Sequence, residues 1–475
     1  MMGTSSRTYK SIGKGRIQAS LQDSASAAPL ASFRFLFGLV MACAMARFVV
    51  KGWVSDVYLE PMFFFRWEGF EWLPSMGPVG MYGLFALLFV AAISIMLGWR
   101  TRIAAAVFAV GFIYLEALDK STYLNHYYLV SLISVLLIFL PSDATFSLNP
   151  KANPNARIPR WQALIIPAQL ALVYFFAGLA KVQPTWLLEA QPLKLWLFAH
   201  HHQPLIGELL SKPETAYLFS WFGAFYDLTI VGWLLWSRTR WFAFGAVVIF
   251  HVLTAWLFPI GIFPWFMIGA ATVFLGAEVH ESVQNFLRTR FQAELRAEAV
   301  SAGTAALPSG RFLPLAPALV ILWFAAQALM PMRYLAYDNE LFWSEEGYRF
   351  SWRVMLMEKA GYVTFYVQNP ETNARSAVRA SDYLTPNQEK MMATQPDMIR
   401  QFAEFLAAEF EQDIPGAEVY ADSWVSLNGT GSKRFIDPSI NLAALRVNPW
   451  ASRDWVLPYT KLDSGLDTKL NTALD

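Results

Sequence analysis

A few polar side chains stand inside or beside long apolar runs of this 475-residue sequence. Asn125 and His126 open one run, Lys181 closes another, and Asp227 and His251 lie within two more. Polar groups are costly in hydrocarbon, so such residues are candidates for function. A buried lysine can act as a base because burial disfavours its ammonium form, although Lys181 can equally be an anchor whose ammonium reaches the membrane surface. The histidines can be hydrogen-bonded core residues, and Asp227 a helix–helix contact. By themselves these residues predict a polar cavity inside a helical bundle.

The composition places these residues in a membrane protein. The chain is 55% hydrophobic and only 15% charged, whereas soluble domains carry about a quarter charged residues. The net charge of +1 gives no support for a nucleic-acid partner, and the single cysteine, Cys43, rules out an intramolecular disulfide. The sequence lacks P-loop, GxGxxG, HExxH and GxSxG motifs. Standard nucleotide, zinc-peptidase and serine-hydrolase functions therefore lack support.

The apolar runs predict a polytopic α-helical membrane protein with about nine transmembrane helices, each near the ~20 residues that cross a bilayer. We expect them near residues 31–50, 79–98, 102–118, 126–141, 162–181, 217–236, 240–257, 260–278 and 313–332. Ala44-Met45-Ala46 has the form of a signal-peptidase site. The polar tail before the first run is long for a signal peptide, so we interpret this run as a retained anchor.

Positive charges predict the orientation, because cytoplasmic loops are rich in lysine and arginine. Cations gather in the N-terminal tail and in alternate loops: Arg7, Lys10, Lys14, Arg16, Arg100, Arg102, Lys151, Arg157, Arg160, Arg238, Arg240, Arg288, Arg290, Arg296 and Arg311. We therefore expect a cytoplasmic N-terminus. With an odd number of spans the C-terminus lies outside the cytoplasm, and a bacterial inner membrane is the expected location.

Three regions follow from this pattern. Residues 1–30 are expected to form a cytoplasmic tail, residues 31–332 a transmembrane catalytic domain, and residues 333–475 a soluble extracytoplasmic domain. Within the membrane region, the stretch from Pro184 to Pro213 is too polar for an ordinary span, and we interpret it as interfacial or re-entrant. Its three histidines, 200–202, suggest metal binding, but no cysteine or carboxylate cluster accompanies them, which favours a polar interface turn.

The soluble region is predicted to be mixed and mostly β. Tyr362–Val367 and Glu418–Leu427 have the composition of strands. Asn428-Gly429 is a hairpin-turn signal that explains these residues better than the glycosylation sequon Asn428-Gly429-Thr430. A helix is expected to start near Thr394 and Pro396. Apolar residues then follow at helical spacing: Met398, Phe402, Phe405, Leu406 and Phe410.

Five segments, in the same order, resemble the vitamin K-dependent γ-glutamyl carboxylases. VYFFAGLAKVQPTW (Val173–Trp186) is similar to the active-lysine segment of that family, and Leu124–Pro150 to its Asn-His segment. Phe250–Trp265, Tyr348–Leu356 and Asp422–Pro438 resemble three others. The chain is much shorter than the animal enzymes, so the resemblance is to a compact bacterial member with an HTTM domain.

The resemblance implies roles in the membrane region. Lys181 matches the lysine that acts as base toward vitamin K hydroquinone. Asn125 and His126 match a pair beside that lysine, which we expect to orient the amine, and His251 matches a histidine of the membrane region. Ala177 and Gly178, one turn before Lys181, are small enough to admit a flat ring.

Further roles are implied in the soluble region. Trp352 and Met355, with Tyr348 in the same segment, match a region linked to glutamate and vitamin K binding. One departure is Met357, which stands where a histidine is expected in the animal enzymes, and the two residues after Trp352 also differ. These changes put carboxylation in more doubt than the quinol reaction.

Three functions remain open. The first is γ-carboxylation of protein glutamate coupled to epoxidation of vitamin K hydroquinone, with O2 and CO2 as co-substrates and no metal. The second is epoxidation without protein carboxylation. The third is a non-enzymatic scaffold that binds quinone or lipid. The implied partners are a protein or peptide glutamate acceptor, membrane lipid and a quinone.

Overall fold

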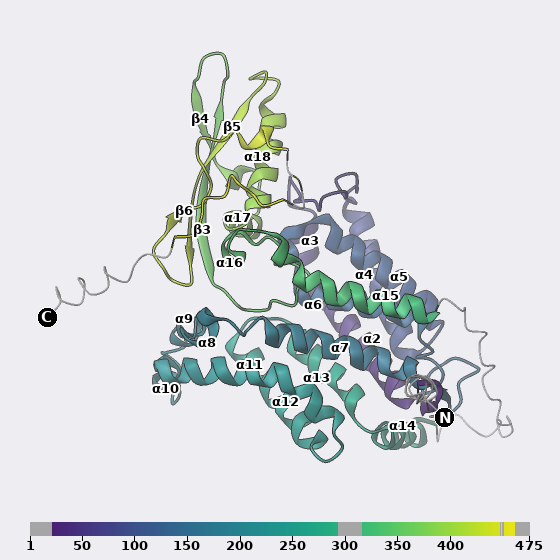
Figure 1. The fold of residues 1–475 in the computed structure, drawn as a ribbon. Coiled ribbons are helices and arrows are strands. Elements are labelled where there is room, and N and C mark those ends of the chain that lie inside the picture. Colours follow the sequence, from purple (N-terminus) through teal and green to yellow (C-terminus); the bar gives the residue numbers. More distant parts are fainter. Residues whose placement is uncertain (1–20, 293–315, 447, 449–450, 461–475) are drawn as a thin grey trace, which may run out of the picture. The chain divides into compact units, whose positions relative to one another are not determined.

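The computed structural model describes residues 21–292, 316–446, 448 and 451–460, and it contains two compact units (Figure 1). Unit 1 holds the described chain up to Leu329 together with Trp352–Val354, and unit 2 holds the rest. Some residues of the predicted loops and of the ninth span lie outside the described residues: Arg7, Lys10, Lys14, Arg16, Arg296, Arg311 and residues 313–315.

Most of the predicted spans are helices of sufficient length. Within the described residues, seven helical runs are long and apolar enough to cross a membrane. They are α2 (Ala28–Val50), α4 (Pro78–Leu97), α5 (Thr101–Leu118), α7 (Arg160–Leu179), α11 (Pro213–Leu235), α12 (Arg240–Leu257) and the run Pro317–Ala336, which includes most of α15 (Ala316–Leu329) and η3 (Met330–Ala336). Their length and apolar composition are those of an integral membrane protein.

Two of the nine predicted spans differ from expectation. The fourth, α6 (Asn125–Phe139), has only 15 residues, fewer than the ~20 of a full crossing. The eighth is broken: α13 (Phe263–Ala271) and η2 (Thr272–Phe274) meet α14 (Ala277–Gln292) at an angle of 110°. The break has a physical reason, because α14 carries charged and amide side chains that hydrocarbon would not accept.

The core of unit 1 is centred on α2, which packs against α4, α13 and α14. The buried charged residue of α2, Arg34, is satisfied by backbone carbonyls. The guanidinium donates to Ile95 and Met96 at the end of α4, and to Ser142 and Phe146 in the loop after α6. Carbonyls at a helix C-terminus lack partners within the helix, so Arg34 both caps α4 and fixes the loop.

A short antiparallel pair of strands holds the starts of two helices together. β1 (Ser24–Ser26) precedes α2, and β2 (Arg157–Pro159) precedes α7. The Arg157 side chain donates to both the hydroxyl and the carbonyl of Ser24. The starts of α2 and α7 are therefore fixed relative to each other.

Helices α7 and α11 run side by side in unit 1 (Figure 1). Their close approach depends on Gly178, because a Cβ atom there would lie 2.8 Å from the backbone nitrogen of Leu228. The space beside Gly178 is thus filled by α11, and this glycine serves helix contact rather than an opening for a flat ring.

The polar stretch between α7 and α11 folds into short helices: α8 (Pro184–Leu187), α9 (Leu193–Phe198) and α10 (Gly207–Ser211). None is long enough to cross a bilayer. The rings of His200 and His201 lie 2.9 and 3.0 Å from the carbonyl oxygens of Leu257 and Phe198. Within the described part of the chain, no group of three or more histidine, cysteine or acidic side chains is placed to hold a metal ion. The remaining short helix of unit 1, α3 (Trp53–Tyr58), follows α2.

Unit 2 has a four-stranded antiparallel sheet in the order β4-β3-β5-β6. The long central pair runs in register from Lys359 opposite Leu427 to Gln368 opposite Glu418. The strands are β3 (Lys359–Gln368), β4 (Arg375–Val378), β5 (Glu418–Leu427) and β6 (Lys433–Arg434). Both predicted strands are confirmed, and Asn428-Gly429 turns from β5 to β6 with positive φ at both residues.

Helices accompany the sheet and confirm the mixed character of this region. They are α16 (Leu341–Ser344), α17 (Pro386–Met392) and α18 (Pro396–Phe410), with short 3-10 turns at Ala380–Asp382 and Leu442–Ala444. The predicted start of α18 near Pro396 is confirmed. Met398, Phe402 and Leu406 are fully buried along one face, and Phe402 packs edge-on against Phe365 of β3.

Candidate active site

Lys181 follows the last turn of α7, and its side chain turns inward. The residue is 8% exposed. Its Nζ donates to the Asp227 carboxylate at 2.6 Å and to the Ala177 carbonyl at 3.2 Å. The indole ring of Trp186 lies 5.6 Å from the same nitrogen. A lysine that only anchors a helix at the membrane surface would extend its amine into water, so this geometry favours a buried functional amine.

Asp227 lies in the middle of α11 and is the ion-pair partner of Lys181. Its side chain is 8% exposed and that of Lys181 is 10% exposed. Leu228, the next residue, packs against Gly178 of α7, so the close helix contact sets the separation of the two charges. The sequence placed Asp227 in a span without naming its partner. The available signal was that a carboxylate in hydrocarbon requires a cation or a hydrogen-bond partner.

Aromatic rings connect this pair to the predicted His251. Tyr226, adjacent to Asp227, stacks on Phe250 with ring centres 4.2 Å apart, and Tyr174 of α7 meets Tyr226 edge-on at 6.1 Å. Phe250 in turn contacts His251. The His251 Nδ1 lies 2.9 Å from the Val247 carbonyl. That carbonyl can only accept, so Nδ1 carries the hydrogen in this contact.

The two predicted histidines both lie near one phenylalanine. The ring centre of Phe263, at the start of α13, is 6.3 Å from that of His251 and 5.3 Å from that of His126. Residues from α6, α12 and α13 therefore meet here, and the aromatic series runs from His126 to the Lys181–Asp227 pair. The hydrogen bonds of the Lys181 amine go to Asp227 and Ala177 rather than to Asn125 or His126.

Asn125 has other partners, which explains why it does not orient the amine. Its Oδ1 accepts a hydrogen bond from the Tyr123 hydroxyl at 3.0 Å, and its Nδ2 donates to the Arg353 carbonyl at 2.9 Å. Trp352 stacks on Tyr128 of α6 with ring centres 5.0 Å apart and is 1% exposed. The start of α6 thus binds Trp352–Val354, the tripeptide that belongs to unit 1.

The chain around this tripeptide adopts an unusual backbone conformation. Glu345, Phe350, Trp352 and Met355 all have φ between 54° and 60°, in the left-handed region that normally suits glycine. Such conformations cost of order 1–3 kcal/mol each and cluster at functional sites. Nothing in the types of these four residues predicted it.

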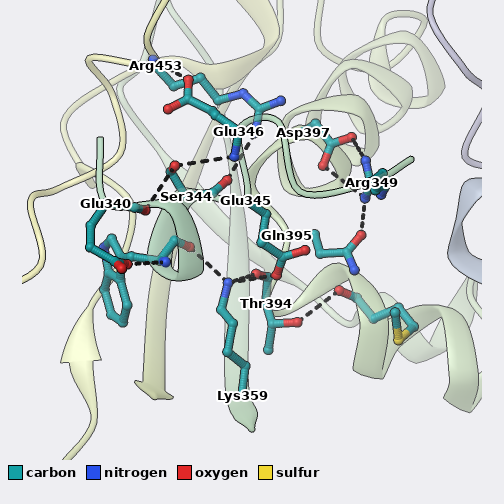
Figure 2. Close-up of polar contacts among 12 residues, drawn as sticks. Glu340, Ser344, Glu345, Glu346, Arg349, Lys359, Thr394, Gln395, Asp397 and Arg453 are labelled. Atoms are coloured by element: carbon teal, nitrogen blue, oxygen red, sulfur yellow. Dashed lines mark hydrogen bonds and ion pairs between the residues drawn. The ribbon is translucent and has the colours of Figure 1, made fainter. Parts of the chain in front are cut away.

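Buried ion pairs in unit 2 hold the residues that flank this segment (Figure 2). The Lys359 amine donates to the Glu345 carboxylate and to the Trp343 carbonyl, both at 2.9 Å, and to the Thr394 carbonyl at 2.6 Å. Burial lowers the pKa of the Lys359 ammonium below its ordinary value, and the neighbouring Glu345 carboxylate opposes that shift. Lys359 fixes the chain at Glu345, before the tripeptide.

A second ion pair lies closer to the tripeptide. Arg349 donates to the Asp397 carboxylate at 2.7 Å and to the Gln395 side chain, at the start of α18 (Figure 2). The predicted Tyr348 precedes Arg349, and its carbonyl accepts a hydrogen bond from the Ser351 hydroxyl. Tyr348 and Met355 both belong to unit 2, whereas Trp352 belongs to unit 1.

Several buried polar side chains of unit 1 have no hydrogen-bond partner within the described residues. Among them are the Gln183 Nε2, two residues after Lys181, the Trp352 Nε1, and the hydroxyls of Tyr174 and Tyr226. Buried donors are normally satisfied, and an unpaired one costs about 1–3 kcal/mol.

A helical bundle with polar side chains buried among apolar spans is typical of a polytopic membrane protein. The comparison with known families shows which family it is. Residues 23–278 match the HTTM domain, so the chain belongs to the HTTM-domain proteins. Residues 314–462 match the lumenal domain of vitamin K-dependent gamma-carboxylase. The chain is thus a member of the vitamin K-dependent γ-carboxylase family. No solved structure gives a significant match.

Proposed function

We propose that this protein carboxylates the γ-carbon of glutamate in a protein or peptide and couples that reaction to the epoxidation of vitamin K hydroquinone. Lys181 is the base that removes the hydroquinone proton. This proposal rests on the Lys181 amine, which lies at the end of α7 and is buried beside the Asp227 carboxylate of α11. The family membership supports the substrate class.

The chemistry requires a base in a dry site. The γ-hydrogen of glutamate is too weakly acidic for any side chain to remove. Reaction of the deprotonated hydroquinone with O2 supplies the stronger base, and CO2 then adds to the glutamate carbanion. The aromatic residues between Lys181 and His126 exclude water from such a reagent. His126 and His251 line the same aromatic series, and Trp352 contributes a buried donor near α6.

We further propose that the protein resides in a bacterial inner membrane with its N-terminus in the cytoplasm and unit 2 outside. The loop cations support this orientation. The glutamate acceptor is then an exported polypeptide. Tyr348 and Met355, on either side of the tripeptide, are proposed to contact the acceptor.

A second function, epoxidation without carboxylation, is favoured by one observation. Met357 stands where the resemblance predicts a histidine. The two functions are separated by their products. Purified protein is incubated with vitamin K hydroquinone, bicarbonate and a glutamate-containing peptide. Vitamin K epoxide is then measured by chromatography, and carboxyglutamate by mass spectrometry. Epoxide without carboxyglutamate supports the second function, and the absence of both products contradicts both.

The variant Lys181→Arg tests the role of the amine. Arginine can keep the ion pair with Asp227, so the variant should fold, but a guanidinium stays protonated and cannot accept the quinol proton. We expect epoxide formation to fall by at least about 100-fold, the lower end for loss of a general base. Alanine is the poorer test, because it leaves the buried Asp227 carboxylate without its cation, which costs about 3–5 kcal/mol.

Lys194→Arg is the matched control. Lys194 lies in α9, and its amine contacts the Tyr217 hydroxyl at 3.2 Å, so the same substitution there should leave epoxide formation unchanged. Normal epoxide formation by Lys181→Arg would refute the proposed base and return Lys181 to an anchoring role.

A further inference from the structure

We infer that Asp227 is the positioning residue that frees the Lys181 amine, because its carboxylate takes the ammonium proton across their 2.6 Å hydrogen bond. This inference rests on the function proposed above and adds a second residue to it. The resemblance to known carboxylases supplied no role for Asp227, and the assignment comes from the contact alone.

Only one of the groups around the Lys181 amine can accept a proton. The Ala177 carbonyl at 3.2 Å accepts a hydrogen bond but not the proton itself, and the Trp186 ring favours a cation over its face. Both of these neighbours stabilise the ammonium form. The Asp227 carboxylate is the one contacting group of the described chain that can convert the ammonium into a free amine.

Burial makes this transfer reasonable. Both side chains are at most one-tenth exposed, so neither charge is well solvated. Loss of hydration penalises separated charges strongly, and it therefore brings the neutral pair of amine and carboxylic acid closer in energy to the ion pair. Because the proton is passed within the pair, the amine is obtained without releasing a proton to water.

The proton balance has two steps. First, the ammonium N–H bond breaks and an O–H bond forms on Asp227, which leaves an amine beside a carboxylic acid. Second, the hydroquinone O–H bond breaks and a new N–H bond forms on Lys181. The quinol oxygen then carries one negative charge and the pair one positive charge. Neither step is an oxidation or a reduction.

Other titratable groups near the pair are few. Tyr174 of α7 and Tyr226 of α11 lie beside Asp227, and phenols ordinarily titrate only near pH 10. Helix α12 contributes Phe250, and α8 contributes Trp186, neither of which titrates. His251, which contacts Phe250, also titrates in the neutral range, so only the part of the acidic limb that changes in an Asp227 variant is assigned to the Lys181–Asp227 pair.

Asp227→Asn tests the inference. The amide is similar in size and still accepts a hydrogen bond, but it cannot take a proton. We expect kcat for epoxide formation to fall about 10- to 100-fold, while KM for the hydroquinone stays within about twofold. The acidic limb should move to lower pH by about one unit or more, because a buried ammonium without its counter-charge loses its proton more readily. In this variant the ammonium proton must pass to water instead of Asp227, and the amine formed is a weaker base, so both effects lower kcat.

Two further variants keep the test decisive. Asp227→Glu retains the acid and should keep the acidic limb at its wild-type position. Glu214→Gln removes an exposed carboxylate from the first turn of the same helix and should behave as wild type. If Asp227→Asn does not fold, Asp227→Glu is the test. An acidic limb of its pH profile displaced from the wild-type position by one pH unit would overturn the inference.

The outcomes separate this inference from the proposed function. No epoxide from the wild-type protein, or full activity of Lys181→Arg, defeats the proposed function itself. An active wild type, an inactive Lys181→Arg and a wild-type kcat and pH profile for Asp227→Asn defeat only the role of Asp227. A purely structural role would lower the yield of folded protein and leave the pH profile of the folded fraction unchanged.

Discussion

The variant Gly178→Ala should disturb the site although position 178 contacts no reacting group. The added Cβ atom would lie 2.8 Å from both the backbone nitrogen and the Cγ of Leu228. Ordinary contacts between such atoms are about 3.5 Å or more, so α7 and α11 must separate locally by about 0.7 Å. Leu228 follows Asp227, and the displacement is therefore passed to the Lys181–Asp227 contact.

The expected energies partly cancel. Overpacking of this kind costs about 1–3 kcal/mol, whereas replacing glycine by alanine within a helix gains up to about 1 kcal/mol. The net loss of stability is then about 0–2 kcal/mol. The effect on catalysis is larger, because a misplacement of about 1 Å can cost up to about 100-fold in rate. We expect epoxide formation per folded protein to fall about tenfold.

The assay is epoxide formation together with thermal unfolding in detergent, and Gly232→Ala is the control. Gly232 lies in α11, and a Cβ atom there would have no neighbour within 4 Å. Alanine at position 232 should therefore leave activity unchanged and stability equal or higher. If Gly178→Ala kept full activity and unfolded at a higher temperature, as expected for the control, the tight contact between the two helices would be disproved.

Three further predictions concern unit 2 and the topology. Glu345→Gln leaves the buried Lys359 ammonium without its carboxylate and should cost about 3–5 kcal/mol of unfolding free energy, measured by denaturant titration, whereas Glu345→Leu combined with Lys359→Met should lie near wild type. Burial lowers the pKa of Lys359 in the folded chain. At a pH between this lowered value and the ordinary value, the unfolded chain therefore carries a proton on Lys359 that the folded chain has lost. The unfolding free energy should therefore rise with pH across this window in wild type but not in Lys359→Met. Thr372→Cys in a Cys43→Ser background places the only thiol in the exposed β3–β4 turn. It should react with an impermeant maleimide in intact spheroplasts, and labelling only after permeabilisation would contradict an external unit 2.

Hydropathy located most of the membrane helices because a helix that crosses lipid needs a long apolar run. Such a run can be recognised in the sequence of each segment by itself. Hydropathy could not show that α6 ends at Phe139 or that the chain bends between Phe274 and Ala277, since both depend on packing and on local polarity. Whether the number of membrane crossings is odd or even therefore depends on α6 and on the break between α13 and α14. The orientation of the C-terminal unit is a prediction from the loop cations.

The site was predictable by residue type but not by pairing. Lys181 stood out as an ionisable group at the end of an apolar run, and Asp227 stood out in another. Their contact joins residues 46 positions apart, which no local pattern encodes. The positive φ values from Glu345 to Met355 were equally hidden, because they occur at residues that ordinarily avoid this conformation. In contrast, Asn428-Gly429 predicted a turn correctly, because both residue types tolerate positive φ.

The assignment of Trp352–Val354 to unit 1 has a consequence for how such proteins can evolve. Recombination between related genes usually exchanges whole domains at the linkers that join them. Here, a crossover placed in the sequence between the last membrane helix and β3 would import a foreign tripeptide. That tripeptide would then have to match the resident Asn125 and Tyr128. Viable chimeras should therefore inherit α6 and residues 352–354 from the same parent, although these residues fall in the two segments that match different domain families.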